Sequence, residues 1–214
     1  KYRALVMIGL YATGILIGII AALVSNKTIF RGKPVPFVME LPNYRFPSIK
    51  SVLILVWEKA KDFLVRAFTI ILIATVVIWF LQSFDTRLNT VADSAGSILA
   101  AIGKFIAPVF RPLGFDDWRV STALITGFTA KEAVISTMGV LLGTDISNLG
   151  TALGTLFTPP AAVGFLVFTL LYTPCVAAIA AIKRELRSGG LTLLLVIAQC
   201  VIAWIAAFAV YGLF

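Results

Sequence analysis

The chain contains four runs of about 20 residues without a charged side chain, and this feature limits the fold more than any other. The runs are Ala4–Val24, Ala67–Phe84, Ala161–Ile182 and Leu191–Phe214. A helix of that length crosses the hydrocarbon core of a bilayer. Inside that core only helices and closed barrels satisfy their own backbone groups. We therefore predict an all-α fold, a polytopic bundle of transmembrane helices.

The composition agrees with a membrane protein and excludes several kinds of enzyme. Hydrophobic residues make up 60% of the chain and charged residues 13%, with a net charge of +8. The basic residues lie between the apolar runs, which favours lipid headgroups over nucleic acid as their partner. The sequence has no histidine, so it excludes Ser-His-Asp and Cys-His catalysis and H-E-x-x-H zinc sites. Both ends adjoin apolar runs, so we expect a part of a longer protein.

Residues 26–66 form a basic connector between the first two spans. Because Lys and Arg exceed Asp and Glu there, the positive-inside rule places it in the cytoplasm. Prolines prevent a helix through its first half, where Glu40 is a candidate helix cap or a candidate contact to a neighbouring domain. Its second half, Ser51–Phe63, has the pattern of an amphipathic helix that lies on the membrane and leads into the next span.

The number of crossings depends on Ser94–Phe110, which is short and followed by proline and glycine. We interpret it as a short crossing or a re-entrant segment, which gives five or six crossings in all. Positive-inside reasoning then places residues 104–119 and 183–190 in the cytoplasm, and 85–93 and 143–160 outside. We expect 143–160 to be a loop.

Val120–Leu142 is a fifth apolar run, but Lys131 and Glu132 lie in its middle. Each charge costs roughly 2.5–3.5 kcal/mol at the centre of a membrane helix. As one helix, this run would place Glu132 on a face with Thr129 and Ser136. Two interpretations stay open: a buried ion pair that joins helices, or the polar lining of a cation path with Glu132 as a ligand.

Pro174 and Cys175 interrupt the run Ala161–Ile182. Pro174 has no N–H for the Leu170 carbonyl, so we predict a broken helix with that oxygen free. Broken helices at mid-membrane are where transporters bind their substrates, and a thiolate beside oxygen donors suits a divalent metal such as Fe(II). The alternative is a small buried cysteine packed beside a kink. For Cys200 a packed core cysteine is the better interpretation.

Several motifs occur in a fixed order, and together they resemble the membrane region of the FeoB ferrous-iron transporters. They are Glu40-Leu41-Pro42-x-Tyr44-Arg45-x-Pro47, Trp57-Glu58-Lys59-Ala60-Lys61-x-Phe63, Gly127-Phe128-x-Ala130-Lys131-Glu132, Leu171-Tyr172-x-Pro174-Cys175-Val176-Ala177 and Ile182-x-Arg184-Glu185. The resemblance runs from about residue 35 to the end of the chain.

This resemblance implies a bacterial or archaeal importer of Fe(II) in the cytoplasmic membrane, with a separate GTPase domain and two Gate-type repeats. The chain would be the C-terminal part with the second repeat: residues 1–25 a transmembrane helix, 26–66 the connector, and 67–214 the Gate-type domain. Cys175 and Glu132 become metal-ligand candidates. Pro174, Lys131, Thr129, Ser136 and Glu40 become candidates for the path or its gating.

The chain has no G-x-x-x-x-G-K-[ST] phosphate loop, so we expect it neither to act as an enzyme nor to bind GTP by itself. The resemblance implies further partners: the rest of the same protein, the bilayer, small accessory proteins of iron uptake, and a second copy in a homo-oligomer. Two alternatives stay open, namely a transporter of another, nucleoside-like solute and a membrane scaffold that transports nothing.

Overall fold

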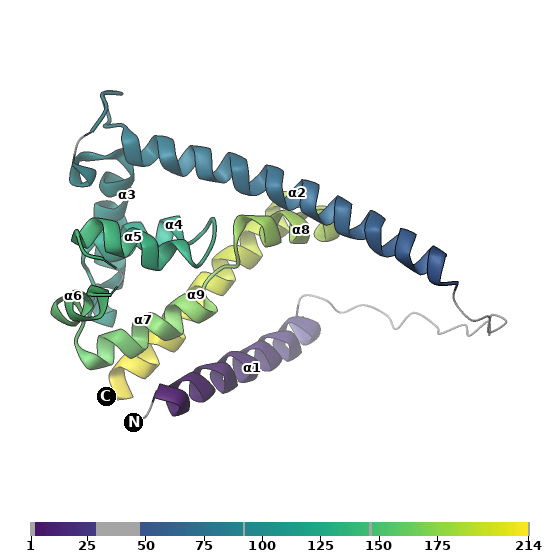
Figure 1. Cartoon of the computed structure of the whole chain (residues 1–214). Helices are drawn as coiled ribbons and strands as arrows, with labels where there is room; N and C mark the ends of the chain where they lie inside the picture. Colours follow the sequence, from purple (N-terminus) through teal and green to yellow (C-terminus); the bar gives the residue numbers. More distant parts are fainter. Residues whose placement is uncertain (1–2, 29–47, 92, 146, 214) are drawn as a thin grey trace. The chain divides into compact units, whose positions relative to one another are not determined.

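The structure, a computed structural model, describes residues 3–28, 48–91, 93–145 and 147–213. In chain order its elements are α1 (Arg3–Thr28), α2 (Ile49–Ser83), the 3-10 turn η1 (Ser94–Gly96), α3 (Ile98–Ile106), the 3-10 helix η2 (Ala107–Leu113), α4 (Trp118–Thr126), α5 (Ala133–Leu142), α6 (Leu149–Leu156), α7 (Pro159–Leu171), α8 (Val176–Leu186) and α9 (Gly189–Leu213), shown in Figure 1. The described residues form no strand, so the all-α prediction is confirmed.

Three helices in the described ranges, α1, α2 and α9, are long and apolar enough to cross a membrane. Two bent pairs raise this number to as many as five if each pair is one span. The larger of these numbers, five, equals the smaller of the two numbers of crossings expected from the sequence. The chain is therefore a helical membrane protein with both continuous and broken spans.

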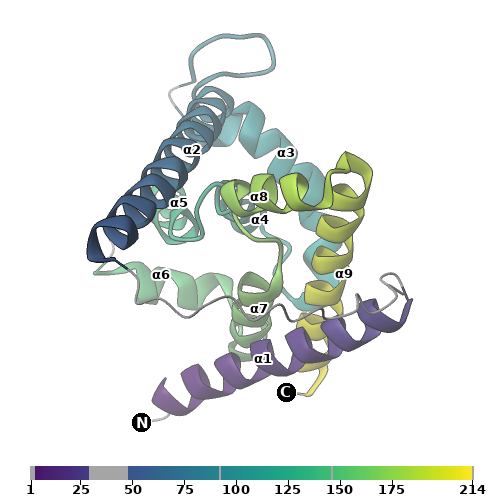
Figure 2. The same ribbon diagram turned by 90° about the vertical axis from the view of Figure 1, so that its right-hand side faces the viewer.

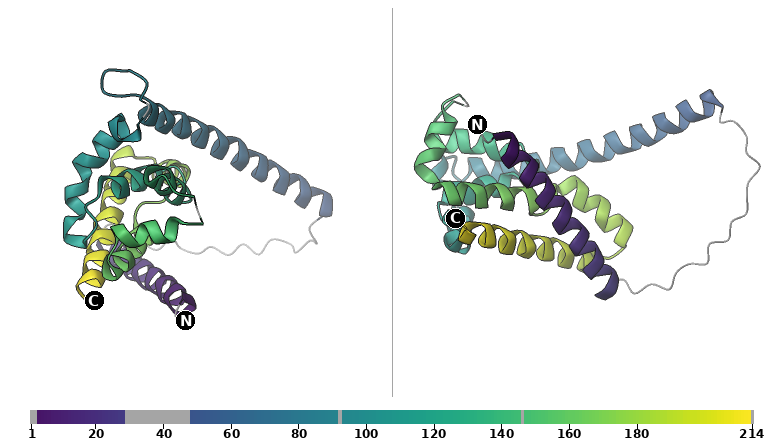
Figure 3. Two further views of the ribbon diagram at one scale, coloured as in Figure 1. Left: turned by 60° about the vertical axis from the view of Figure 1, so that its left-hand side comes forward. Right: turned by 90° about the horizontal axis from the view of Figure 1, so that it is seen from below.

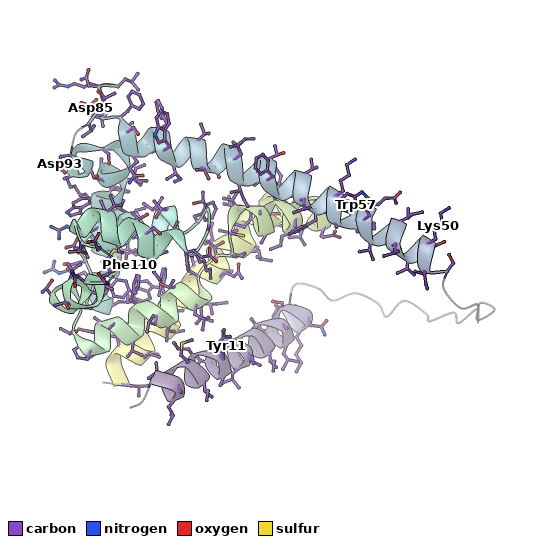
Figure 4. The ribbon with its side chains drawn as sticks, viewed as in Figure 1. Tyr11, Lys50, Trp57, Asp85, Asp93 and Phe110 are labelled. Atoms are coloured by element: carbon purple, nitrogen blue, oxygen red, sulfur yellow. The ribbon has the colours of Figure 1, made fainter. Side chains whose placement is uncertain are left out.

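The chain divides into two compact units, residues 1–65 and 66–214. The first holds α1, whose most apolar stretch buries none of its residues within the described chain, and the start of α2. Lys50 and Trp57, labelled in Figure 4, are exposed there. The amphipathic segment Ser51–Phe63 is helical and continues without a break into the second span. Glu40 lies outside the described residues.

A loop with local hydrogen bonds joins α2 to η1. A single antiparallel bridge pairs Phe84 with Thr90. Between them, the Asp85 carboxylate accepts hydrogen bonds from the Asn89 and Arg87 backbone amides (Figure 4). The bond from the Asn89 amide is the main cause of a lowered pKa of Asp85. The next helical turn begins where the Asp93 carboxylate accepts the Ala95 amide.

In the second unit α7 and α9 run side by side, as Figures 1 and 3 show. A Cβ at Gly164 would lie 3.4 Å from the Ala207 carbonyl oxygen, so glycine allows the two backbones to approach closely. The indole N–H of Trp204 on α9 donates to the Val109 carbonyl of η2 at 3.0 Å. These contacts attach the C-terminal helix to the middle of the chain.

The segment Ser94–Phe110 does not cross the membrane as one helix. It contains η1, α3 and the start of η2, and the nine residues of α3 span only about 14 Å of a core about 30 Å thick. The stretch Ile98–Leu113 bends by 107° into α4. Of the two interpretations offered by the sequence, a short crossing by one helix does not fit, and the bend allows a re-entrant segment or a broken span that includes α4. Asp117 caps α4 by accepting the Arg119 amide at 2.7 Å.

A chain of aromatic rings fills the core of the second unit. Phe115 stacks on Phe110, with ring centroids 5.4 Å apart. Phe110, labelled in Figure 4, meets Phe168 edge to face at 5.1 Å, and Phe168 stacks on Tyr172 at 5.5 Å. Such pairs contribute about 0.5–1.5 kcal/mol beyond their buried area. They connect the turn before α4 with the end of α7.

Two sequence predictions are wrong. Val120–Leu142 is not one span, because α4 ends at Thr126 and α5 begins at Ala133. Between them the backbone forms four-residue turns, among them Thr129 N–H to Thr126 C=O. The Phe128 carbonyl accepts a tertiary hydrogen bond from the Val176 amide, and the Lys131 side chain bonds carbonyls at the end of α7, as described below. Residues 143–160 are not only loop, since they contain α6.

We predict that Gly103→Ala destabilises the packing of α3 on α4. A Cβ at Gly103 would lie 2.9 Å from the Trp118 carbonyl oxygen and collide with the Thr122 side chain. Overpacking of this kind costs about 1–3 kcal/mol, so the thermal unfolding temperature in detergent should fall. Gly150→Ala is the matched control, because nothing lies within 4 Å of its Cβ position. Equal unfolding temperatures for the two variants would contradict the prediction.

Candidate functional site

Two interruptions of the helices lie against each other in the second unit. The first break is Gly127–Glu132, between α4 and α5, and the second break is Tyr172–Cys175, between α7 and α8. The Val176 amide donates to the Phe128 carbonyl at 2.9 Å, and Figure 2 shows the second break as the non-helical connection from α7 to α8. Each break therefore supplies a backbone partner to the other.

Gly127 allows this close approach. A Cβ at that position would collide with the Val134 side chain and the Tyr172 hydroxyl. As the C-cap of α4, Gly127 also donates its backbone N–H to the Ala123 carbonyl at 2.9 Å. Side-chain size at residue 127 thus limits how closely the two breaks meet.

Pro174 explains the second break, as predicted. Proline cannot donate to the Leu170 carbonyl, and its ring would clash there. Helix α7 accordingly ends at Leu171, with a last bond from the Tyr172 amide to the Phe168 carbonyl at 2.8 Å. Tyr172 and Cys175 then have extended backbones. The Pro-broken helix predicted from the sequence is confirmed.

Lys131 joins the two breaks through its ammonium group. Its Nζ donates to the carbonyl oxygens of Thr169 at 3.0 Å, Leu170 at 3.1 Å and Tyr172 at 3.4 Å. It also lies 4.8 Å from the centroid of the Tyr172 ring, within the range of a cation–π contact. Within the described ranges Lys131 forms no ion pair with a carboxylate, so the alternative of a Lys131–carboxylate bridge has no support here.

The other residues of the first break are arranged differently from the sequence expectation. Because Val120–Leu142 is not one helix, the common face of Thr129, Glu132 and Ser136 does not extend along a single span. The Thr129 hydroxyl donates to the Thr126 carbonyl. Glu132 precedes α5 and is exposed, and Ser136 is exposed on α5. The structure therefore brings Lys131 to the second break but bonds neither Glu132 nor Ser136 to it.

Cys175 is a free, half-buried thiol at the start of α8, directly before the amide that bonds Phe128. Cys200, on α9, is also free and half-buried. The described part of the chain has no group of three His, Cys, Asp or Glu side chains that could hold a metal ion. The donor set at the second break is thus one thiol with oxygen atoms.

Three buried hydroxyl groups, one in the last turn of α7 and two in the second break, have no hydrogen-bond partner within the described residues. They belong to Thr169, Tyr172 and Thr173, and Thr173 is only 4% exposed. More than nine in ten buried polar groups are bonded in folded proteins, so these oxygens indicate a place for water or a cation. Sequence reasoning did not single out the two threonines, although Thr173 directly precedes Pro174 and Thr169 lies about one and a half turns before it.

A hydrogen bond between two buried hydroxyl groups joins α4 to α5, the helices on either side of the first break. Thr126 and Thr137 lie 2.8 Å apart through their Oγ1 atoms, and Thr126 also donates to the Ala123 carbonyl at 2.8 Å. Thr126 donates to Ala123, so the shared hydrogen comes from Thr137. This bond crosses the interruption and keeps the two short helices in register.

Two family models match the chain. The Gate model, described as "Nucleoside recognition", matches residues 64–189. The model described as "Ferrous iron transport protein B C terminus" matches residues 7–59. The boundary between the two falls inside α2.

Curated relatives named as iron transporters match nearly the whole chain. The "Fe(2+) transporter FeoB" of Staphylococcus aureus (strain MSSA476) is 37% identical over 98% of the chain and 31% of its own length. That of Campylobacter jejuni is 39% identical over 94% of the chain and 35% of its length. In Porphyromonas gingivalis the relative is an "Fe(2+) transport protein A/Fe(2+) transporter FeoB fusion protein", 33% identical over 97% and 30%.

The chain spans about a third of the length of these relatives. No solved structure matches it.

We predict that Thr126→Val and Thr137→Val each destabilise the protein but are not additive. Each single change leaves a buried hydroxyl with one partner fewer, which costs about 1–3 kcal/mol. The double variant should lose about 1 kcal/mol less than the sum, as expected for residues in contact. Unfolding in detergent measures this cycle. Thr155→Val, at an exposed site, is the control, and strictly additive losses would contradict the prediction.

Proposed function

Because this chain belongs to the FeoB family of Fe(2+) transporters and carries its Gate domain, we propose that it lines part of the path of Fe(II) through the membrane. It would be the C-terminal membrane portion of a GTPase-linked importer. The observation that supports this most directly is the meeting of two helix breaks, with a thiol and unbonded oxygens at the second one.

The chemistry of the second break suits a ferrous ion in transit. Thiolates favour softer transition metals, whereas carbonyl, hydroxyl and carboxylate oxygens favour harder ones, and Fe(II) accepts both. Cys175 would supply sulfur, and Thr169 and Thr173 would supply oxygen beside it. A donor set with a single thiol holds an ion less firmly than a closed cluster of thiolates, which suits an ion that has to leave again.

Glu132 has a different role in this proposal. It is exposed beside the first break and makes no capping hydrogen bond. A carboxylate at such a place raises the local concentration of cations. We assign it to attracting Fe(II) towards the breaks and to a ligand position on the route. Thr129 and Ser136 would contribute further oxygens to that route, while Pro174 keeps the second break open.

The partners follow from the length of the relatives. The two thirds of the relatives' length that this chain does not cover would include the GTPase domain, which binds GTP, and a first Gate repeat that completes the path. The fusion in P. gingivalis supports a small accessory protein of iron uptake as a partner. The protein would be a multi-pass component of the bacterial inner membrane and form homo-oligomers. Glu40, in the cytoplasmic connector 26–66, would contact a neighbouring domain.

We predict that Cys175→Ser in the full-length protein lowers Fe(II) uptake by more than about tenfold, since even outer-shell partners contribute that much to metal affinity. Serine keeps the size of the side chain but removes the soft donor. Uptake into cells or proteoliposomes measures the effect, with membrane insertion checked by immunoblot. Cys200→Ser is the matched control, a second free, half-buried thiol. Normal uptake by the Cys175 variant would remove this residue from the path.

We further predict that Glu132→Gln slows uptake at low Fe(II) concentration by about tenfold, because a single sign of charge at the entrance steers cations. The defect should shrink at high ionic strength, where the charge is screened. Asp145→Asn, at another exposed carboxylate, should leave uptake unchanged. A defect in the Glu132 variant that is equal at low and high salt would contradict the steering role.

A further inference from the structure

The end of α7 has the features of a cation site. Carbonyl oxygens of Thr169, Leu170 and Tyr172 converge on one point, since all three lie 3.0–3.4 Å from the same nitrogen atom. The C-terminal end of a helix carries about half a negative charge from its unbonded carbonyls. The face of the Tyr172 ring, 4.8 Å from that nitrogen, adds a further negative potential.

The occupant of this site is the ammonium group of Lys131. An ammonium has three N–H donors and no acceptor, which matches three carbonyl oxygens. The lysine comes from a different helix pair, about 40 residues away in sequence, as the separation of 39 between Lys131 and Leu170 shows. The positive charge of Lys131 thus compensates the partial negative charge of the carbonyl oxygens that the break at Pro174 leaves without helical hydrogen bonds.

The ammonium is held without a permanent counter-charge. Within the described ranges no carboxylate pairs with Lys131, and its side chain is only half-buried. A lysine has four rotatable bonds and a compact charge, so it can leave and return without unfolding a helix. The neighbouring hydroxyls of Thr169, Tyr172 and Thr173 have no partner, so oxygen atoms remain for a second occupant.

We propose that the three carbonyl oxygens at the end of α7 form a cation-binding site, that the Lys131 ammonium is its resident occupant, and that an ion on the path displaces it. The last step rests on the proposed transport of Fe(II) past Cys175. While the lysine is in place, its charge repels a dication and neutralises the carbonyls. Lys131 is then a gating residue that sets the ion concentration at which the second break fills.

Chemical rescue in the full-length protein tests the cation site without iron. Lys131→Ala removes the equivalent of a propylammonium group. Its thermal unfolding temperature in detergent should fall below that of the wild type, and added n-propylammonium should raise it again, whereas n-propanol should not. Lys104→Ala is the matched control, because Lys104 donates to one carbonyl, Ala95, and lies over the Trp118 ring. A propylammonium effect no larger in the Lys131 variant than in this control would overturn the cation site.

The gating step is tested by Fe(II) uptake at varied ion concentration. Lys131→Met keeps the length of the side chain and removes the charge, so it also serves if the alanine variant does not fold. The apparent KM for Fe(II) should fall by about fivefold or more, the lower end of coupling between two binding sites, with the maximal rate retained. A lower maximal rate at unchanged KM would overturn the gate and leave a structural link. If the wild type transports no Fe(II), the proposed function fails, while propylammonium rescue still decides the cation site.

Discussion

Backbone groups that a helix break frees inside a membrane have no water to bond, so other parts of the protein have to supply their partners. This requirement explains the centre of the structure. Proline at 174 frees carbonyls at the end of α7, and the Lys131 ammonium bonds three of them. The first break frees the Phe128 carbonyl, and the Val176 amide bonds it. The two breaks are therefore stable as a pair, and each would be costly alone.

The surrounding packing serves this pair. The aromatic rings from Phe115 to Tyr172 fix the end of α7, and the Thr126–Thr137 bond keeps α4 and α5 aligned across the first break. Gly127 leaves room for the Tyr172 hydroxyl. This packing leaves the Lys131 ammonium and the Cys175 thiol near the junction of the two breaks. In the proposed path the framework stays fixed while cations bind there and leave.

The sequence predicted those elements that depend on local chemistry. Long charge-free runs predicted α1, α9 and the second part of α2, and Pro174 predicted the second break. The Leu170 carbonyl has lost its helical partner there, but it accepts a hydrogen bond from Lys131. The first break was missed because Val120–Leu142 contains no proline and its apolar run is long enough for a span. Its cause is tertiary: Lys131 gains three carbonyl partners only when α7 is already broken nearby. The same error affected the predicted site. Glu132 and Ser136 were expected to share a face with Thr129 only because the run was taken as one continuous helix, which it is not.

In the proposed path a ferrous ion binds at the second break through the sulfur of Cys175. X-ray absorption at the iron edge tests this binding directly on full-length protein loaded with Fe(II) without oxygen. We predict one sulfur scatterer at about 2.3 Å, the distance typical of a metal–thiolate bond, with oxygen atoms completing the shell. The sulfur should be lost in Cys175→Ser but not in Cys200→Ser. A shell of oxygen and nitrogen alone in the wild type would contradict it.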